Sequence, residues 1–320
     1  MSVKQEMIQL LEQNRGKVLS GQEMADQLGV TRAAIWKAIR VLQEEGYHLG
    51  IVKNKGYYLE EHSDVLSVEG IRLHLPEEYK TLKIEVLKTV DSTNNYAKKM
   101  SASHSERCLI LAEEQTAGRG RRKRDFYSPY GTGIYMSLVF PVETSLAKFV
   151  PITVAASVAV VRAIQKLTNI KCDIKWVNDI YLDGKKICGI LTEAVSDFES
   201  GMIEAIIIGI GINVSTKQFP EELLDKATSL GIENINRSKF IALIVNEILK
   251  IIDEDFNNVL NEYKDASCVL NKKVEFRYKG QIYNGIAKDI NNLGNLIVKC
   301  DNQEYTLNSG EVSIIQKNYE

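Results

Sequence analysis

Residues 118–124 form the stretch of this sequence that is best suited to binding an anion. They read Gly-Arg-Gly-Arg-Arg-Lys-Arg, so five of the seven side chains are cationic. The two glycines allow backbone conformations and close approaches that other residues do not. An apolar run, residues 109–112, precedes them, and a strand ending in a flexible basic loop is a reasonable anion-binding device. A solvated basic loop, or a nucleic-acid patch, fits the same residues.

Four further polar clusters interrupt segments that are otherwise apolar. Residues 91–94 (Asp-Ser-Thr-Asn) would cap a helix, and their amides and hydroxyls could hold a polar ligand group. Residues 175–179 (Lys-Trp-Val-Asn-Asp) follow one predicted strand, and residues 209–213 (Gly-Ile-Gly-Ile-Asn) end another. Lys186 stands just before an apolar strand. Taken singly, each cluster also fits an ordinary cap, turn or exposed lysine.

No familiar protein nucleophile or histidine base is visible in the sequence. It contains no GxxxxGK[ST] loop, no HExxH motif and no Ser/His/Asp set, and residues 209–213 lack the third glycine of a dinucleotide fingerprint. The five cysteines and four histidines have no ligand spacing, so we expect neither a metal site nor a disulfide. Arginines, lysines and amides around glycine loops are typical of positioning and charge stabilisation, as in phosphoryl and adenylyl transfer.

Length and composition limit the broad class of the protein. Its 320 residues are enough for two or three domains, and 44% hydrophobic with 26% charged residues is typical of a globular chain. A net charge of −2 excludes a bulk polyanion binder, so any nucleic-acid contact must come from a local patch. No signal peptide and no run of about 20 apolar residues is visible, so we expect a cytoplasmic protein without a membrane span.

The N-terminal segment, residues 1–62, has the helix spacing of a winged helix-turn-helix domain. Apolar positions predict helices over 3–12 and 22–28, and a third that runs to about residue 45. Small Ala25 would let two helices approach, Gly29 would allow the tight turn, and Ile35 would fill the space between them. A hairpin over residues 52–59 would form the wing.

Basic and polar groups gather on the third helix and the wing of this segment, which favours DNA binding. A domain used for protein contacts, or a plain helical cap, is the alternative. The expected DNA-binding residues are Gly21, Thr31, Arg32, Trp36, Lys37, Arg40, Lys53 and Lys55.

The remainder of the chain predicts two more domains, at residues 66–268 and 271–320. In the first, apolar runs predict a mixed sheet with helices against it, because strands and helices do not alternate strictly. In the second, short alternating segments predict a small β-barrel. The predicted strands cover residues 83–89, 109–112, 134–140, 174–176, 187–194, 203–208, 273–278, 282–288, 296–300 and 304–307. The predicted helices cover residues 93–100, 146–167 and 238–263.

The five polar clusters occur in an order that resembles the biotin–protein ligases. The pattern joins residues 91–94, Gln115 through Arg122, Lys175-Trp176-x-Asn178-Asp179, residues 186–189 and Gly209-x-Gly211-x-Asn213. With the winged helix, the whole chain is similar to the bifunctional ligase/repressor type, the BirA family. The resemblance implies an α+β multidomain protein: a winged helix-turn-helix, a mixed-sheet ligase domain like that of biotin and lipoate ligases, and an SH3-like β-barrel.

The resemblance also implies a two-step, ATP-dependent reaction. The carboxylate of biotin attacks the α-phosphate of ATP, with Mg²⁺ as cofactor, and gives biotinyl-5′-adenylate. A lysine of a biotin carboxyl carrier protein, from acetyl-CoA carboxylase or pyruvate carboxylase, then takes the biotin. In this family the adenylate is also a corepressor that promotes a homodimer on the biotin operator. A ligand-sensing regulator without ligase activity, and a lipoate–protein ligase, are the alternatives.

The roles implied for individual residues follow from their places in the shared motifs. Lys186, Arg121 and Asp179 would be catalytic, with Lys186 near the biotin carboxylate or the α-phosphate. The residues expected to bind biotin are Ser92, Thr93, Asn94, Gln115, Gly118, Arg119, Gly120, Arg121, Lys186 and Gly189. The residues expected to bind ATP or the adenylate are Arg121, Arg122, Arg124, Phe126, Asn178 and Asn213.

Three positions depart from the family pattern. Many relatives have Trp where Phe126 stands, packed against adenine, and Phe can still stack there. Relatives usually have Pro where Val177 stands, so the turn after Trp176 would be less rigid. Some have Gly where Lys123 stands, which here adds charge and removes flexibility.

Overall fold

The structure is a computed structural model that describes residues 2–101, 106–144, 149–196, 202–252, 254–301 and 303–315. The chain divides into two compact units. One comprises Met1–Thr81 with Ile232–Leu243, and the other Leu82–Gly231 with Ile244–Glu320. The start of the helix predicted over 146–167, and His104, lie outside the described residues.

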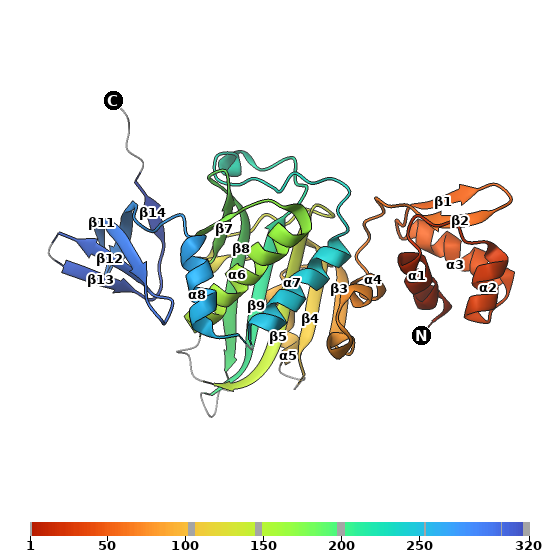
Figure 1. Cartoon of the computed structure of the whole chain (residues 1–320), viewed down its shortest axis with the longest axis horizontal. Coiled ribbons are helices and arrows are strands. Elements are labelled where there is room, and N and C mark those ends of the chain that lie inside the picture. Colours follow the sequence, from red (N-terminus) through yellow and green to blue (C-terminus); the bar gives the residue numbers. More distant parts are fainter. Residues whose placement is uncertain are drawn as a thin grey trace. The chain divides into compact units, whose positions relative to one another are not determined.

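The N-terminal unit contains the predicted winged helix-turn-helix (Figure 1). Its helices are α1 (Val3–Gln13), α2 (Gly21–Leu28) and α3 (Arg32–Glu44), and its wing is the antiparallel pair β1 (Leu49–Val52) and β2 (Gly56–Leu59). Ser2, Ser20 and Thr31 cap the three helices through their hydroxyls. Each hydroxyl satisfies an amide that the first turn leaves without a partner.

The predicted turn between the second and third helices is confirmed. Gly29 ends α2 with φ at 65°, a left-handed conformation that glycine adopts without strain. Ala25 and Ile35 are buried at 2% and 1% exposure in one apolar cluster with residues of α1 and the wing. The small alanine and the buried isoleucine therefore hold α2 against α3, as the sequence predicted.

Two helical segments of this unit were not predicted. α4 (Val68–His74), with Ser67 as its cap, packs against α1, and a short 3-10 turn (Glu77–Tyr79) follows it. The first residues of α7 (Arg237–Ile251) also group with this unit. The weak sequence signal has a physical reason: α4 has only seven residues, too few for a clear helical period.

The second unit is built on a seven-stranded mixed sheet. Its strands are β3 (Lys83–Val90), β4 (Cys108–Gln115), β5 (Gly133–Thr144), β6 (Asp173–Lys175), β7 (Asp179–Leu182), β8 (Lys185–Ser196) and β9 (Ile203–Asn213). The order across the sheet is β3-β4-β5-β9-β8-β7-β6, with β3 and β4 parallel and the other pairs antiparallel. The predicted mixed sheet is therefore confirmed.

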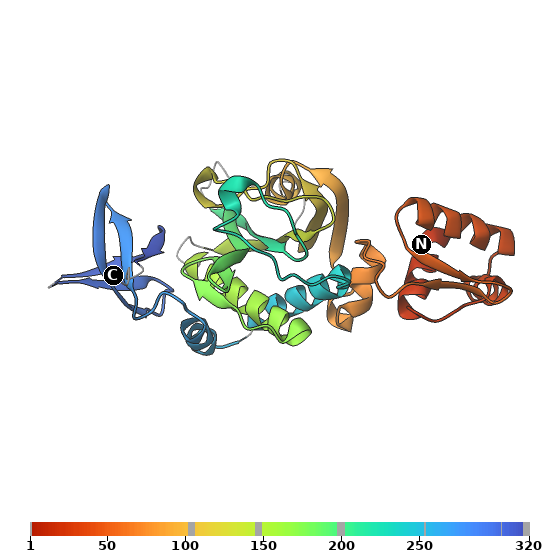
Figure 2. The same cartoon turned by 90° about the horizontal axis from the view of Figure 1, so that it is seen from above.

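Helices cover both faces of this sheet (Figures 1 and 2). α5 (Thr93–Ser101) packs on one face against β4, β5 and β9. α6 (Phe149–Thr168) and α8 (Phe256–Asp265) lie together on the other face. The buried strands β4 and β9 are nearly continuous apolar runs, as expected for strands covered on both sides.

The structure corrects one prediction for this unit and adds one strand. The helix predicted over 238–263 is two helices, α7 and α8, and Asp255 caps the second. Residue 179 begins a separate short strand, β7, that was not predicted. Residues 209–213 end β9, as the sequence indicated, although the predicted strand stopped at residue 208.

The C-terminal part of the second unit is a five-stranded antiparallel sheet. It contains β10 (Lys273–Tyr278), β11 (Gln281–Ile290), β12 (Leu296–Cys300), β13 (Gln303–Leu307) and β14 (Val312–Ile314), in the order β13-β12-β11-β10-β14. The first four confirm predicted strands, and β14 was missed because it has only three residues. An aromatic group of Phe276, Tyr278, Tyr283 and Tyr305 packs across the sheet.

Across the described residues, none of the helices combines the length and apolar character needed to cross a lipid bilayer.

Candidate active site

A cavity on the α5 side of the sheet brings the five polar clusters together. The space between its lining residues is about 440 Å³ when the part open to solvent is included. Residues predicted to bind ligand supply most of its lining: Ser92, Thr93, Asn94, Gln115, Arg119, Gly120, Arg121, Phe126, Asn178, Lys186 and Gly189. The lining also includes Met136, Ile190, Leu191, Gly209, Ile210 and Gly211.

The start of α5 carries a buried polar network into this cavity. Gln115 Oε1 accepts from the backbone N and the hydroxyl of Thr93, at 2.9 and 3.1 Å. Ser137 Oγ lies 2.8 Å from Thr93 Oγ1 and 2.6 Å from Asn94 Oδ1, and its one hydrogen can be donated to either oxygen. Thr93, Asn94 and Ser137 are at most 3% exposed. Buried polar groups with this many partners hold one geometry, so they suit a neutral polar ligand group.

Asn94 is fixed from its other side by β8. Its amide nitrogen donates to Leu191 O at 3.2 Å and to Glu193 Oε2 at 2.8 Å. Glu193 also pairs with Lys98 of α5 at 2.6 Å. Sequence reasoning missed Ser137 and Glu193, although a polar residue inside an apolar strand was an available signal for both.

Two glycines of β9 open the floor of the cavity. Gly209 and Gly211 lie two residues apart, so they face the same side of the strand. A Cβ on Gly209 would stand 2.1 Å from Asn94 Oδ1, and one on Gly211 would stand 2.5 Å from the Phe126 ring. The glycines are therefore needed for close approach of neighbouring side chains to the sheet.

The basic loop of residues 118–124 folds back on itself beside the cavity. Phe126 N donates to Gly118 O at 2.9 Å, and Gly120 N to Arg124 O at 2.7 Å. Arg122 lies in a 3-10 turn with φ at 56°, a left-handed conformation uncommon for a residue with a side chain. The loop thus forms a tight hairpin that presents Arg121 and Phe126 to the cavity.

Arg121 is the loop cation that reaches furthest into the cavity. Its Nη1 donates to Asn178 Oδ1 at 3.1 Å, and Asn178 Nδ2 donates to Ile190 O at 2.8 Å. Burial lowers the pKa of Arg121, partly offset by the carboxylate of Asp179. A largely desolvated guanidinium held by a neutral amide favours a bound anion, because an anion would compensate its charge.

Lys186 and Asp179 form an ion pair at the edge of the cavity. Lys186 Nζ lies 2.8 Å from Asp179 Oδ1, and their side chains are 29% and 25% exposed. Lys186 Nζ also lies 6.0 Å from the centre of the Phe126 ring. Gly189, the partner of Asp179 in the β7–β8 ladder, leaves room for this ammonium, since a Cβ there would be 3.0 Å from Nζ.

The turn that carries Asn178 is held by neighbouring elements. Trp176 Nε1 donates to Gly294 O at 2.9 Å, and the Tyr263 hydroxyl of α8 donates to Val177 O at 3.0 Å. Burial raises the pKa of Tyr263 well above its usual range, so the hydroxyl stays a donor. These bonds position Asn178 and Asp179 between the sheet and the C-terminal strands.

Several residues predicted for the site do not line the cavity. Arg124 turns away and forms a two-point ion pair with Glu311, at 2.6 Å for each nitrogen–oxygen contact. Arg122 is exposed, and Asn213 is buried and donates to Thr228 O at 3.0 Å. Gly118 packs against the backbone of Phe126, where a Cβ would stand 2.4 Å from the Phe126 oxygen.

The residues predicted to contact DNA lie in the N-terminal unit, apart from this cavity in sequence. On α3, Arg32, Trp36, Lys37 and Arg40 are exposed, and the Arg40 guanidinium lies 5.1 Å from the Trp36 ring centre. Trp36 is 55% exposed although it is a large apolar residue. Thr31 caps α3 and Gly21 begins α2.

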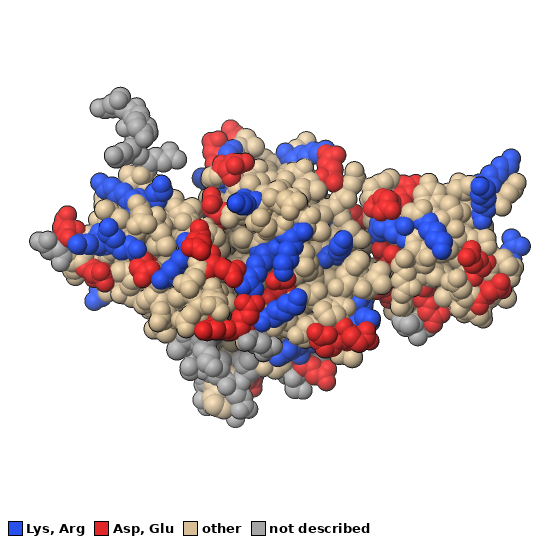
Figure 3. All heavy atoms as spheres, in the orientation of Figure 1, with Lys and Arg blue, Asp and Glu red and all other residues tan. Residues whose placement is uncertain are grey.

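The wing adds further positive charge. Lys53 and Lys55 are both exposed in the turn that joins β1 to β2. Figure 3 shows Lys and Arg side chains at the tip of this hairpin. An exposed basic helix face followed by a basic wing is the arrangement by which winged helices meet the phosphate backbone and base edges.

Comparisons with known proteins find a matching family for each of three parts of the chain. Residues 86–213 match the biotin/lipoate A/B protein ligase family, residues 3–58 match an HTH domain, and residues 269–314 match the biotin protein ligase C-terminal domain. A solved biotin protein ligase from Aquifex aeolicus, in complex with biotin and ATP, superposes with a TM-score of 0.63 at 25% identity. That superposition covers 73% of this chain and 99% of the other.

Curated relatives share both functions in their names. The bifunctional ligase/repressor BirA of Bacillus subtilis is 40% identical over 232 residues, 72% of this chain and 71% of that protein. The bifunctional ligase/repressor BirA of Escherichia coli is 28% identical over 307 residues, 93% of this chain and 94% of that protein. The chain belongs to the BirA family of bifunctional ligase/repressors. It is a biotin protein ligase that also has a DNA-binding repressor role.

Proposed function

We propose that the cavity binds biotin and ATP and forms biotinyl-5′-adenylate. The buried network of Thr93, Asn94, Gln115 and Ser137 supports this proposal, because it suits the neutral ureido ring of biotin. Arg121 and Lys186 also line the cavity, and the carboxylate and phosphate charge would lie beside them. The observation that carries the proposal is this pairing of a neutral polar pocket with a cationic edge.

In the first step, a carboxylate oxygen of biotin attacks the α-phosphorus of ATP. The bond between that phosphorus and the bridging oxygen breaks, and pyrophosphate leaves. Arg121 and Lys186 would stabilise the negative charge that gathers on the α-phosphate oxygens. Phe126 lies between Gly211 and Lys186 and would stack on the adenine. Gly118, Arg119 and Gly120 would shape the loop around the bound adenylate.

In the second step, a lysine amine of a biotin carboxyl carrier protein attacks the acyl carbon of the adenylate. An amide bond forms, AMP leaves, and the amine releases its proton. The substrates thus supply both nucleophiles, which agrees with the absence of a recognisable protein nucleophile in the sequence. The carrier is the biotin domain of a carboxylase, and the reaction takes place in the cytoplasm.

Mg²⁺ would enter this site with the phosphates of ATP. Among the described lining and edge residues, Asp179 offers a carboxylate, but it already pairs with Lys186 at 2.8 Å. Asn178 is bonded to Arg121, and Asn213 lies outside the lining. These residues fit a cation held mainly by nucleotide oxygens, in keeping with the preference of Mg²⁺ for phosphates and water. Bound there, Mg²⁺ would neutralise phosphate charge.

A transfer assay tests the ligase proposal. Labelled biotin, ATP and a carrier domain are incubated with the wild-type chain, Arg121→Ala, Lys186→Ala and the control Arg277→Ala, whose side chain is exposed on β10. Loss of one charged donor should slow adenylate formation by about 100-fold in the first two variants and leave the control unchanged. Wild-type rates in Arg121→Ala would overturn its role. Lipoate transfer in place of biotin transfer would assign the chain to the other branch of its family.

We also propose that the adenylate promotes a homodimer that sets two winged helices on a palindromic operator. Arg32, Lys37, Arg40, Lys53 and Lys55 would neutralise phosphates, and Trp36 would contact the groove. Gel-shift titration on the protein's own biotin operator, with and without biotin plus ATP, measures this coupling. Equal operator affinity in both conditions would rule out the corepressor role.

A further inference from the structure

Three side chains with metal-binding atoms lie together at the base of the wing. His48 comes just before β1, and Glu60 and His62 follow β2. Their ligand atoms lie within 4.8 Å of one another, and no other set of three His, Cys, Asp or Glu side chains within the described ranges is as close. Spacing along the chain gave no sign of this group, because the hairpin alone brings residue 48 beside residues 60 and 62.

The backbone beneath this group is fixed by hydrogen bonds. Glu60 N donates to His48 O at 2.9 Å, which extends the β1–β2 ladder by one residue beyond Leu49 and Leu59. His48 N donates to Ser63 Oγ at 3.0 Å. The Cα atoms of all three residues are therefore held in fixed positions. This limits the conformational entropy that the three side chains lose when they bind a ligand.

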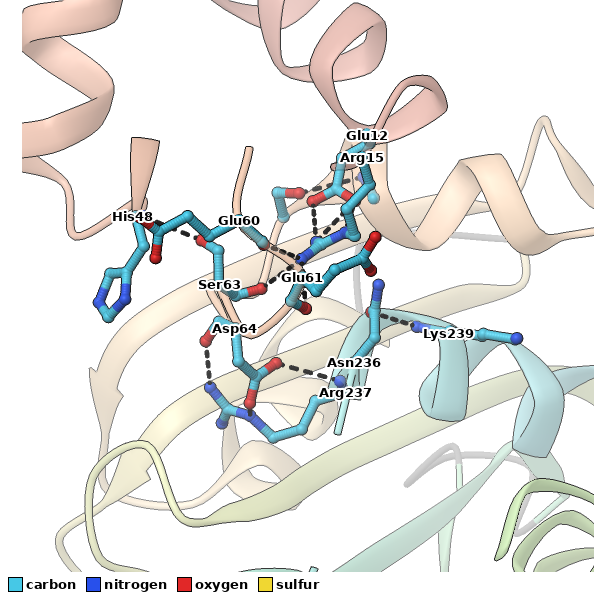
Figure 4. A network of polar contacts seen from close by, with 12 residues as sticks. Glu12, Arg15, His48, Glu60, Glu61, Ser63, Asp64, Asn236, Arg237 and Lys239 are labelled. Atoms are coloured by element: carbon cyan, nitrogen blue, oxygen red, sulfur yellow. Dashed lines mark hydrogen bonds and ion pairs between the residues drawn. The ribbon is translucent and has the colours of Figure 1, made fainter. Parts of the chain in front are cut away.

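Arg15 binds the backbone of the same segment, as Figure 4 shows. Its Nη1 donates to the carbonyl oxygens of Glu60, Glu61 and Ser63, at 3.1, 3.2 and 2.7 Å. Its Nη2 donates to both oxygens of the buried Glu12 carboxylate at 2.7 Å, and its Nε donates to Glu12 Oε2 at 3.2 Å. Because Arg15 pairs with Glu12, the positive charge of the guanidinium is already compensated.

The geometry of the three side chains is close to that of a metal site. His62 Nε2 lies 2.9 Å from Glu60 Oε2, and the His48 and His62 rings stand 5.2 Å apart at 78°. In tetrahedral coordination with bonds of about 2.0–2.1 Å, ligand atoms lie about 3.3 Å apart. The present separations need only small side-chain rotations to reach that value, and exposed side chains such as His62, 48% exposed, can make them.

We propose that His48, Glu60 and His62 form a binding site for a divalent transition-metal ion of the Zn²⁺ class. Two imidazole nitrogens and one carboxylate oxygen form a known zinc donor set, and water would complete the coordination. The occupied site would cross-link the start of β1 to the segment that leaves β2. It would therefore stabilise the winged helix by binding the folded state alone.

Calorimetric titration of the full chain with ZnCl₂, without a histidine tag, tests the site. We expect one ion bound per chain in the micromolar range, and at least about tenfold weaker binding in His48→Ala and in His62→Ala. Glu60→Gln should weaken binding in the same direction. Titration with Co²⁺ should give a ligand-field spectrum without thiolate-to-cobalt charge transfer, because the site contains no cysteine.

Matched controls separate this site from general metal binding. His74→Ala removes a histidine of α4, and Glu61→Gln removes a neighbouring carboxylate; neither is in the group, so both should bind Zn²⁺ as the wild type does. No binding up to about 1 mM Zn²⁺, or equal affinity in the His48→Ala/His62→Ala double variant, would overturn the proposal. A thiolate charge-transfer band would overturn it as well. Biotin transfer is a separate readout that the exposed His62→Ala change should leave intact.

Discussion

At the scale of single residues, the absence of side chains shapes the cavity as much as their presence does. Three glycines of the sheet leave space for neighbouring side chains because they have no Cβ atom. Asn94 packs against Gly209, Phe126 against Gly211 and Lys186 against Gly189. Because Asn94 is held by Ser137, Leu191 and Glu193, it has little freedom to move aside for a new methyl group.

Gly209→Ala should therefore impair biotin binding more than stability. The new Cβ would stand 2.1 Å from Asn94 Oδ1 and force the buried amide out of its network. We expect the KM for biotin to rise at least about tenfold, which corresponds to about 1.4 kcal/mol of lost binding. Gly21→Ala is the control, because nothing lies within 4 Å of a Cβ there. An unchanged KM in Gly209→Ala would contradict this account of the cavity floor.

At the scale of elements, buried ion pairs join segments that the sequence separates. Arg237, the first residue of α7, donates through Nε to Asp64 Oδ2 at 2.6 Å and through Nη2 to Asp64 O at 3.0 Å. Its side chain is only 3% exposed, against 25% for that of Asp64. Arg15 holds the preceding residues of the same segment, as Figure 4 shows.

Asp64→Ala should destabilise the N-terminal unit by about 3 kcal/mol, because it removes the carboxylate from a buried guanidinium. Glu45→Ala is the matched control. Glu45 pairs with Lys4 at 2.7 Å, but both side chains are 41% exposed, so its loss should cost less than about 1 kcal/mol. Urea unfolding followed by circular dichroism measures both values. Equal effects of the two substitutions would show that burial of the Asp64–Arg237 pair is unimportant.

Arg162 of α6 joins the segment around α8 through two carboxylates. It binds Glu254 at 2.7 Å and Glu262 at 2.6 Å. The hydrogen bond to Arg162 lowers the pKa of Glu254. Since the folded pKa is the lower one, this carboxylate stabilises the fold above its unfolded pKa and loses that effect as the pH falls through the folded pKa.

Glu254→Gln should therefore reduce stability at pH 7 and make little difference in acid. We expect the gap from wild type to close as the pH falls below the unfolded pKa of Glu254 and then through its lowered folded pKa, where the wild-type carboxylate takes up a proton. Urea midpoints measured from pH 7 to pH 3 give the comparison. A gap that stays constant over this range would mean that the ionised form of Glu254 contributes nothing.

At the scale of the whole molecule, the candidate ligase site and the candidate DNA-binding residues belong to different units. The cavity draws on strands of the second unit, whereas the exposed basic residues of α3 and the wing belong to the first. A substitution on either surface should first affect the function of that surface. Only the proposed dimerisation promoted by the adenylate would then link biotin transfer to operator binding.

Lys37→Ala should weaken operator binding without slowing biotin transfer. Removal of one phosphate contact should reduce affinity for all DNA sequences and lower the slope of log affinity against log salt by about one. Arg121→Ala should instead reduce the biotin-dependent part of operator binding, because it would form the adenylate about 100-fold more slowly. Gel shifts at several salt concentrations, paired with the transfer assay, distinguish the two variants. Slow biotin transfer in Lys37→Ala would contradict the separation.

The sequence alone determined most of the helices and strands and revealed the polar clusters of the candidate ligase site. Helical and strand periods, caps at Ser20 and Thr31, and Gly29 at its turn depend on neighbours within a few residues, so the winged helix and most strands could be predicted. The polar clusters at residues 91–94 and 118–124 could also be recognised, because their residue types are unusual for the segments that contain them.

Only the tertiary structure decided which of these groups meet. In the structure Arg121 forms a hydrogen bond with Asn178 and Arg124 forms an ion pair with Glu311, although both arginines belong to one basic loop. It also gathered His48, Glu60 and His62, which share no motif. Pairing across strands and packing between distant segments fix these contacts, and local sequence carries no record of such long-range register.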